Sequence, residues 1–197
     1  RLLDGGTRSL TVRLFPMQTL KLPVIRGTIE RRILVNYRVD PSVLERLLPR
    51  PFRPRVFNDS GMVGMCLIRL KSVRPRGLPP WVGIGSENAA LRAAVEWEQG
   101  SGVFIWRRDT STWLNTLAGG RVFPGIHQHA QFTVNETRDD LDVAFRSDDG
   151  GNYFSIRAHA AERLPAGSVF GSLHEASNFF HAGSPEYFQT KDPPQTQ

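Results

Sequence analysis

Two histidines stand two residues apart in the segment GIHQHAQF, at His127 and His129. On a β-strand this spacing places both imidazole rings on one face of the sheet. Three roles are open for the pair: metal ligands, acid/base groups, or polar side chains that line a surface without doing chemistry. A metal would need further ligands from other strands, for which His159 is the candidate. Acid/base catalysis suits a side chain whose ordinary pKa is near neutral.

An arginine on a second predicted strand is a candidate anion-binding group. Residues 87–98 alternate between two faces, and the GSG that follows leads into the strand-like VFIWRR, which indicates a hairpin. One face carries Leu91, Ala93, Val95 and Trp97, and the other carries Asn88, Ala90, Arg92 and Glu96. Arg92 could hold a carboxylate through a two-pronged contact. The alternative is an ion pair with Glu87 or Glu96.

The elements that must position these groups are mostly strands. Strands are predicted over residues 28–39, 61–70, 87–98, 103–108, 126–136, 142–147 and 152–162. Short helices are predicted over 40–49, 109–120 and 172–183, beginning at Asp40, Asp109 and Ser172, and Glu175 completes a capping box in the last. Residues 71–86 are predicted to form a long loop and 189–197 a disordered polar tail. The pattern indicates one mostly β (α+β) domain over residues 1–188.

The composition is that of an ordinary globular chain with a basic balance. It has 197 residues, 40% of them hydrophobic, and a net charge of +6 that comes mainly from arginine. The single cysteine, Cys66, excludes a disulfide within the chain and fits a cytoplasmic protein. No stretch approaches the ~20 apolar residues of a membrane span, and no signal peptide is evident, so we expect no membrane partner.

Several kinds of chemistry have no support in the sequence. There is no Gly-x-Ser-x-Gly elbow and no glycine-rich phosphate loop, and Cys66 lies in an apolar run, so we expect no cofactor. The basic charge leaves a nucleic-acid-associated protein open as an alternative. The arginines are scattered, however, and no familiar nucleic-acid motif is present, so nucleic acid is not the partner we expect.

The order of the pieces resembles the acetoacetate-decarboxylase-like superfamily, and within it the DUF2071 (YqjF-like) branch. The resemblance covers residues 28–188 and rests on VNYRVDPSVLERLLP, GMVGMCLIRL, ENAALRAAV, GSGVFIWRRDTSTWLNTLAGGRVF, IHQHAQFTV and SLHEASNFF in that order. It implies a closed, cone-like antiparallel β-barrel with a few short peripheral helices and a ligand cavity inside. Relatives of this fold assemble into multimers, so a homo-oligomer is an open expectation.

The chain departs from the true decarboxylases, in which a lysine near the start of a strand forms a Schiff base with the keto acid. Matching IHQHA to that stretch places His127 at the Schiff-base position and Gln128 at its partner. A histidine cannot form the imine, so the resemblance argues against decarboxylation by that mechanism. Arg121 follows Gly120 where the decarboxylases also have Gly-Arg.

The DUF2071 branch often has an acid, an asparagine and an arginine at alternate positions of one strand. The matching positions in ENAALRAAV are Asn88, Ala90 and Arg92, so only the arginine is in register. Glu87 is one residue away and faces the other side unless a bulge rotates it. The candidate ligand-binding residues are Arg92, Asn88, Glu87 and Arg121, and the candidate catalytic residues are His127 and His129. No metal is expected, and if one binds, its ligands would be His127, His129 and His159.

From these observations we expect a cytoplasmic protein whose barrel cavity binds a small organic molecule with a carboxylate or carbonyl group. Whether it is an enzyme stays open. If it is one, His127 or His129 would act as an acid or base on a carbonyl compound. If it is not, the chain is a ligand-binding barrel.

Overall fold

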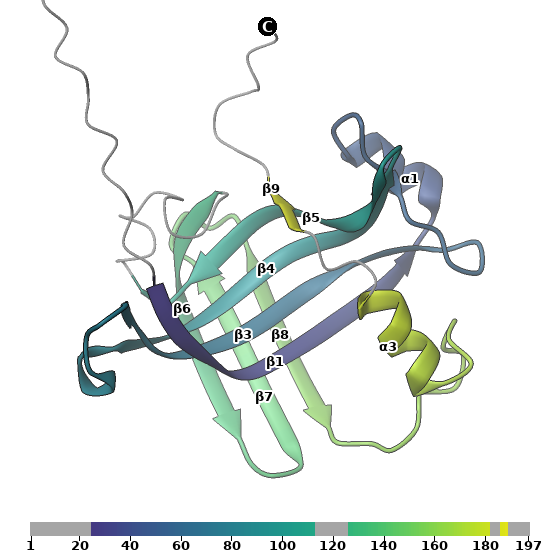
Figure 1. Cartoon of the computed structure of the whole chain (residues 1–197). Coiled ribbons are helices and arrows are strands. Elements are labelled where there is room, and N and C mark those ends of the chain that lie inside the picture. The colour runs from purple at the N-terminus through teal and green to yellow at the C-terminus, as the bar shows by residue number, and fades with distance from the viewer. Residues whose placement is uncertain (1–24, 113–125, 182–185, 189–197) are drawn as a thin grey trace, which may run out of the picture.

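The computed structural model describes residues 25–112, 126–181 and 186–188 (Figure 1). The strands are β1 (Ile25–Val39), β2 (Arg53–Pro54), β3 (Gly61–Pro75), β4 (Ile84–Trp97), β5 (Gly100–Thr110), β6 (His127–Glu136), β7 (Asp140–Ser147), β8 (Tyr153–His159) and β9 (Glu186–Phe188). The helices are α1 (Pro41–Leu47) and α3 (Leu173–His181), with a 3-10 turn, η1 (Pro80–Val82). None of the described helices has the length and apolar character needed to cross a membrane. The mostly β class is confirmed.

The strands form one sheet whose path is β1-β3-β4-β5-β6-β7-β8, with β2 beside β4 and β9 beside β5. Neighbours are antiparallel except at β5, which runs parallel to both β6 and β9. The prediction of a wholly antiparallel sheet is therefore wrong at the β5–β6 seam. Within the described residues the path ends at β1 and β8, so closure into a barrel is not confirmed.

Side chains alternate along each strand, so the central strands β1, β3, β4 and β5 present two faces. One face, which we call the core face, packs against β6 and β7. The contact joins the central strands to these two strands through buried residues: Met65, Leu67 and Ala89 on one side, and Ala130, Val143 and Phe145 on the other. What we call the helix face packs against α3 and the segment before it through Met62, Ala94, Phe170 and Phe179. In Figure 1 the β6–β7–β8 strands cross behind β1 and β3, and α3 lies in front of them.

Both described helices begin where the sequence predicts. The Asp40 carboxylate accepts a 2.8 Å hydrogen bond from the Ser42 backbone N–H at the start of α1. At the start of α3 the Glu175 N–H donates to the Ser172 hydroxyl at 3.1 Å, and the Glu175 carboxylate accepts from the Gly171 N–H at 2.6 Å. On α3 the ring of Phe179 is buried and Leu173 is exposed.

Half of the predicted loop 71–86 is strand, because β3 continues to Pro75 and β4 already begins at Ile84. Ser72 has a φ of 52°, and the β3–β4 register shifts between Leu70 and Val73. The bulge accommodates one extra residue of β3, and the two strands pair again beyond it. The three prolines of this segment lie at the tip of the β3–β4 connection.

The predicted helix at 109–120 is wrong at its start. Asp109 and Thr110 end strand β5, and residues 113–120 lie outside the described residues. Asp109 is 1% exposed and does not cap a helix. Its carboxylate accepts hydrogen bonds from Arg107 at 2.9 Å, Ser147 at 2.6 Å and Asn152 at 2.8 Å. The predicted tail, 189–197, is also outside the description, and β9 was not predicted.

Charged side chains connect the two layers at the end of β6. Arg31 of β1 donates to Glu136 at 2.7 Å, and Arg69 of β3 contacts the same carboxylate oxygen at 3.0 Å. The hydrogen bond from Arg31 is the main reason that the pKa of Glu136 is lowered. Both arginines also bind Glu87 of β4, so three strands of the central sheet are linked to β6.

A second charged group joins β5 to the turn between β7 and β8. Arg107 reaches from Asp109 to Asp149, donating two hydrogen bonds of 2.7 and 2.8 Å to the Asp149 carboxylate. These bonds, together with one from the Gly151 N–H, lower the pKa of Asp149 from 3.8 to about 2. The pair therefore holds the β7–β8 turn against β5 only while Asp149 is ionised.

We predict that Asp149→Asn removes part of the acid sensitivity of the fold. The folded-state pKa is below the ordinary value, so the stabilisation by ionised Asp149 is complete above pH 3.8 and is lost as the pH falls through about 2. In denaturant titrations at a series of pH values, the variant should lose less stability across this window than the wild type. Asp59→Asn, at an exposed loop carboxylate, is the control and should keep the wild-type slope. Parallel profiles for wild type and Asp149→Asn would contradict the assignment.

Candidate functional site

Most of the predicted site residues lie on the helix face of the central sheet, in three rows that cross neighbouring strands. The first row is Asn36, Gly64, Arg92 and Ile105; the second is Leu34, Cys66, Ala90, Arg108 and His127; the third is Arg32, Ile68, Asn88, Thr110 and His129. Arg92 and His127 are two strand spacings apart across the sheet, about 9.6 Å, and one row apart along it, roughly another 7 Å. The register therefore brings Arg92, Asn88, His127 and His129 to one face.

Arg92 is the most deeply buried cation of this face. Its side chain is 6% exposed, and its Nη2 atom donates a 2.8 Å hydrogen bond to Oδ1 of Asn36. The guanidinium also lies over the ring of Phe180 from α3, 5.4 Å from its centroid. An arginine stays charged at any physiological pH, and a buried charge needs partners. Asn36 and Phe180 position this guanidinium between the sheet and α3.

Gly64 makes the contact between Arg92 and Asn36 feasible. It lies on β3, in the same row, between the two residues that β4 and β1 contribute. A Cβ atom at this position would overlap the carbonyl oxygen of Val35. Only glycine therefore allows β1 and β3 to lie this close together. Their closeness sets the distance between Arg92 and Asn36.

Asn88 is fixed by its own strand and by the strand next to it. Its amide nitrogen donates to the carbonyl of Ile68 at 3.3 Å, to the carbonyl of Ser86 at 3.1 Å and to the hydroxyl of Ser86 at 2.9 Å. The amide nitrogen is thus engaged by the scaffold. Of this side chain, the carbonyl oxygen is the atom that remains suited to accept a hydrogen bond from a ligand.

His129 is paired with a carboxylate. Its Nδ1 atom lies 2.7 Å from Oδ2 of Asp148, and the Asp148 backbone N–H donates to the His129 carbonyl at 3.0 Å. A carboxylate accepts hydrogen bonds, so Nδ1 is the ring nitrogen that donates in this pair. This is the arrangement in which a histidine accepts a proton at Nε2 and shares the resulting charge with the aspartate.

Two of the predicted ligand-binding residues are not placed in the site. Glu87 lies on the core face, as its register predicts, and is bound to Arg31 and Arg69. It is therefore separated from Arg92 by the thickness of the sheet, and its inclusion among the ligand-binding candidates is not supported. Arg121 lies outside the described residues.

The three histidines considered as metal ligands are not brought together. His159 pairs with Asp140 at the far end of β8, where its side chain is 71% exposed. This end of the sheet lies level with Glu136, seven residues along β6 from His129, or about 23 Å at ~3.3 Å per residue. Across residues 25–112 and 126–181 no three His, Cys, Asp or Glu side chains form a group suited to a metal ion.

The structure adds polar residues to this face that the sequence did not single out, among them Asn36 and Arg108. Asn36 shares the row of Arg92, and Arg108 shares the row of His127. Asn36 had a signal, since it alternates with Arg32 and Arg38 on the more polar face of RRILVNYRV. Arg108 had none, because its neighbour His127 is set by parallel pairing between strands that are distant in sequence.

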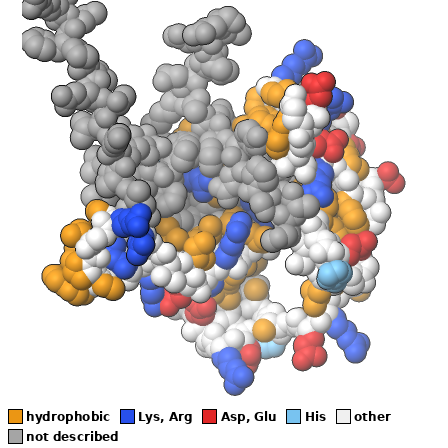
Figure 2. All heavy atoms as spheres, viewed as in Figure 1, with side chains coloured by type: hydrophobic (Ala, Val, Ile, Leu, Met, Phe, Trp, Pro, Cys, Tyr) orange, Lys and Arg blue, Asp and Glu red, His pale blue; other side chains and the backbone are white. Residues whose placement is uncertain are grey.

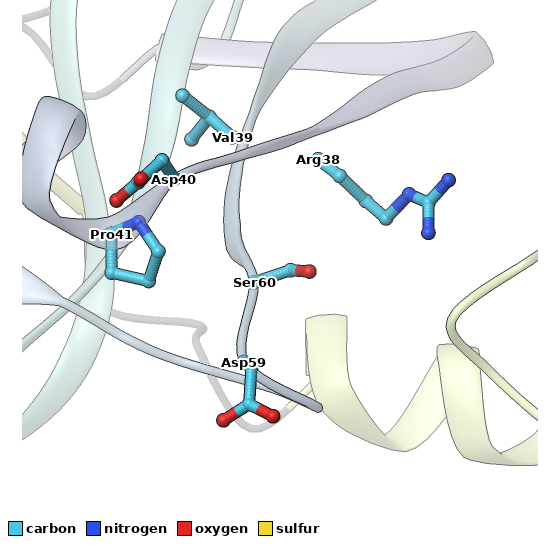
Figure 3. Close-up of a pocket in the computed structure, with 6 residues that line it drawn as sticks. All are labelled: Arg38, Val39, Asp40, Pro41, Asp59 and Ser60. Carbon is cyan, nitrogen blue, oxygen red and sulfur yellow. The ribbon is translucent and has the colours of Figure 1, made fainter.

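A surface hollow of about 420 Å³ lies elsewhere, where β1 meets α1. Figure 3 shows that the side chain of Arg38 extends away from Asp40 and Asp59 on its rim. Asp40 is engaged as the cap of α1, and the hydrogen bond from Ser42 lowers its pKa. The hollow therefore lacks convergent functional groups, and the helix face is the better candidate.

A family model for DUF2071, an uncharacterised conserved protein family, matches residues 26–190. The chain belongs to the DUF2071 family. The match covers most of the chain, including every strand and helix named above except the first residue of β1. A search of the curated proteins gave no match for this DUF2071 protein.

Solved structures with a similar fold are acetoacetate-decarboxylase-like. The acetoacetate decarboxylase of Legionella pneumophila subsp. pneumophila str. Philadelphia 1 is 14% identical with a TM-score of 0.55, over 84% of this chain and 64% of that one. An acetoacetate decarboxylase-like enzyme from Sphingomonas wittichii RW1 is 15% identical with a TM-score of 0.54, over 84% and 70%. The enduracididine biosynthesis enzyme MppR, complexed with pyruvate, is 14% identical with a TM-score of 0.55, over 83% and 68%. At these identities the likeness shows the fold alone.

We predict that Gly64→Ala destabilises this DUF2071 protein by about 1–3 kcal/mol, since the new methyl group meets backbone that cannot move without disturbing the β1–β3 pairing. The free energy of unfolding from chemical denaturation measures the effect. Gly85→Ala is the matched control, because its Cβ would lie 3.3 Å from the nearest atom, the Leu70 carbonyl oxygen, and it should cost clearly less. Equal losses in the two variants would contradict the close approach at Gly64.

Proposed function

We propose that the protein binds a small organic molecule with a carboxylate or carbonyl group at the helix face, with Arg92 as the anion-binding residue. The observation that carries the proposal is the buried guanidinium of Arg92, which Asn36 and Phe180 orient. The rows that contain Asn88, His127 and His129 lie on the same face of the sheet. A pre-positioned guanidinium recognises carboxylates well because it presents two parallel donors.

The helix face is preferred over the space between the layers. The core face is filled by hydrophobic side chains from both layers, among them Leu67, Val143 and Phe145. A polar ligand there would have to displace packed core. The same proposal includes closure of the sheet into a barrel and a cytoplasmic location.

We propose further that the protein does not decarboxylate keto acids through a Schiff base. Imine formation needs a lysine amine, and the chain has three lysines, at positions 21, 71 and 191. Lys71 is exposed and is paired with Glu30 at the outer end of β3. Position 127, which the resemblance equates with the Schiff-base lysine, is a histidine. The ligand is therefore held by charge and hydrogen bonds in this proposal.

Pyruvate is the first probe, because MppR, a protein of the same fold, has been solved with it. We predict that pyruvate binds the wild type in calorimetric titrations and that Arg92→Met weakens binding at least about tenfold, as expected for the loss of a charge-assisted hydrogen bond. Arg157→Met, at a site 87% exposed, is the matched control and should bind like the wild type.

Arg92→Lys keeps the charge without the two-pronged geometry and tests the same idea if Arg92→Met fails to fold. It should bind pyruvate more weakly than the wild type, since a lysine cannot present two parallel donors. Unchanged affinity in both Arg92 variants would remove Arg92 from the binding site.

A second candidate function is acid/base catalysis on a carbonyl compound, and the His129–Asp148 pair favours it. In this proposal His129 removes a proton next to the carbonyl of a molecule bound beside it, two strands and two rows away from Arg92. A positioned general base contributes about 10²–10⁴-fold to such a step. Asp148 would hold the ring and share the charge that His129 gains.

We predict that the wild type accelerates exchange of the pyruvate methyl protons for deuterium, followed by proton NMR in D₂O. His129→Gln should lower the enzymatic rate about 10²-fold or more. His159→Gln is the control, because His159 forms a similar pair with Asp140 at the far end of the sheet. A rate no faster than buffer, with binding intact, would leave a ligand-binding protein without this activity.

A further inference from the structure

The connection between β3 and β4 ends in an exposed apolar tip. We define the hairpin tip as residues 74–84, RPRGLPPWVGI. Trp81 is 84% exposed, and Leu78, Val82 and Ile84 are also exposed. In Figure 1 this connection stands out from the sheet, and Figure 2 shows hydrophobic side chains beside Lys and Arg side chains at the same place. Large apolar side chains gathered at one projecting point indicate a binding surface.

Hydrogen bonds within the hairpin tip and to the neighbouring Ser72 hold its backbone. Backbone N–H groups of Leu78, Val82 and Gly83 donate to the carbonyls of Pro75, Pro79 and Pro80 at 3.1–3.2 Å. Arg74 braces it further by donating to the carbonyl of Leu78 at 2.9 Å and to that of Ser72 at 2.8 Å. Pro79 and Pro80 restrict the backbone in addition. The apolar side chains are thus presented by a rigid scaffold, which lowers the entropy cost of binding.

The charge around the hairpin tip has one sign. Arg26 and Arg74 are directly opposite each other on β1 and β3, and Arg76 follows two residues later. Residues 72–86 contain no aspartate or glutamate. Like charges opposite each other on neighbouring strands are unfavourable unless an anion lies near them. The surroundings of the tip therefore favour an anionic partner.

We propose that the hairpin tip inserts into the headgroup layer of an anionic lipid membrane. This proposal replaces the expectation of no membrane partner, which rested on the lack of a spanning stretch and of a signal peptide. Tryptophan is enriched at the membrane interface, and arginines beside it attract acidic headgroups. A tip of this size lies on the membrane and does not span it. The proposal is independent of the ligand site on the helix face.

Two other partners fit the hairpin tip less well. Single-stranded nucleic acid is bound by stacking on several aromatic rings, and the tip has one aromatic residue, with aliphatic Leu78, Val82 and Ile84 around it. A symmetric contact with a second copy would bring each Arg26–Arg74 pair against its equivalent. A lipid surface satisfies both the aliphatic side chains and the positive charge.

Vesicle co-sedimentation of the full chain tests the proposal. We expect the wild type to bind vesicles of phosphatidylcholine with about 30% phosphatidylglycerol. Binding should be weaker to phosphatidylcholine alone and should fall as NaCl is raised. Trp81→Ala/Leu78→Ala should bind at least about tenfold more weakly, because two interfacial side chains are lost. Arg76→Glu should also weaken binding to the acidic vesicles.

The controls use equally exposed residues far from the hairpin tip. Leu47→Ala/Leu173→Ala removes two exposed leucines from α1 and α3, and Arg163→Glu makes the same charge change in another loop. Both should bind vesicles like the wild type. Equal binding by Trp81→Ala/Leu78→Ala and wild type, or no binding to acidic vesicles, would overturn the proposal.

Two further measurements assign the surface to another partner if the lipid proposal fails. A concentration-dependent oligomer in analytical ultracentrifugation that Trp81→Ala abolishes would assign the tip to a second copy. A gel shift with single-stranded RNA that Trp81→Ala abolishes would assign it to nucleic acid. In either case, vesicle binding unaffected by the same substitution overturns the lipid proposal.

Discussion

The register of β4 between β3 and β5 decides which charges of this protein meet. Because side chains alternate along a strand, a slip by one residue would exchange the two faces of β4 completely. In the observed register Glu87 meets Arg31 and Arg69 on the core face, while Arg92 meets Asn36 on the helix face. Buried charges tolerate little misplacement, so these contacts and the register stabilise each other. The candidate site is a product of this one alignment.

The two faces use their charges in different ways. On the core face, carboxylates and guanidiniums neutralise each other in networks around Glu136 and Asp109, which join the layers of the fold. On the helix face, Arg92 donates to the amide oxygen of Asn36 and lies over the ring of Phe180. These contacts orient the guanidinium between the sheet and α3, and this orientation is the basis for placing the proposed ligand on the helix face.

The alternation in ENAALRAAV was sufficient to predict β4, its hairpin with β5, and the separation of Glu87 from Arg92. Local signals also predicted both described helices, since Asp40 and Ser172 act through neighbouring backbone. Asp109 was misassigned because aspartate usually caps helices or turns. Its place in a strand depends on Ser147 and Asn152, which lie 38 and 43 residues further along the chain. The β5–β6 pairing, and with it the position of Arg108 beside His127, joins residues 19 positions apart in a parallel arrangement that no local pattern indicates.

The parallel seam between β5 and β6 also divides the chain into two parts that can fold locally. On one side β1, β3, β4 and β5 pair with sequence neighbours, and on the other β6, β7 and β8 form a meander. Three residue pairs join the parts along the seam, between Arg108–Thr110 and His127–His129. Each of these pairs joins residues 19 positions apart, so docking of the meander is a separate step from closing the short β4–β5 and β7–β8 hairpins. Arg92 belongs to one part and both site histidines to the other, so a ligand that contacts both would stabilise the docked state and slow its opening.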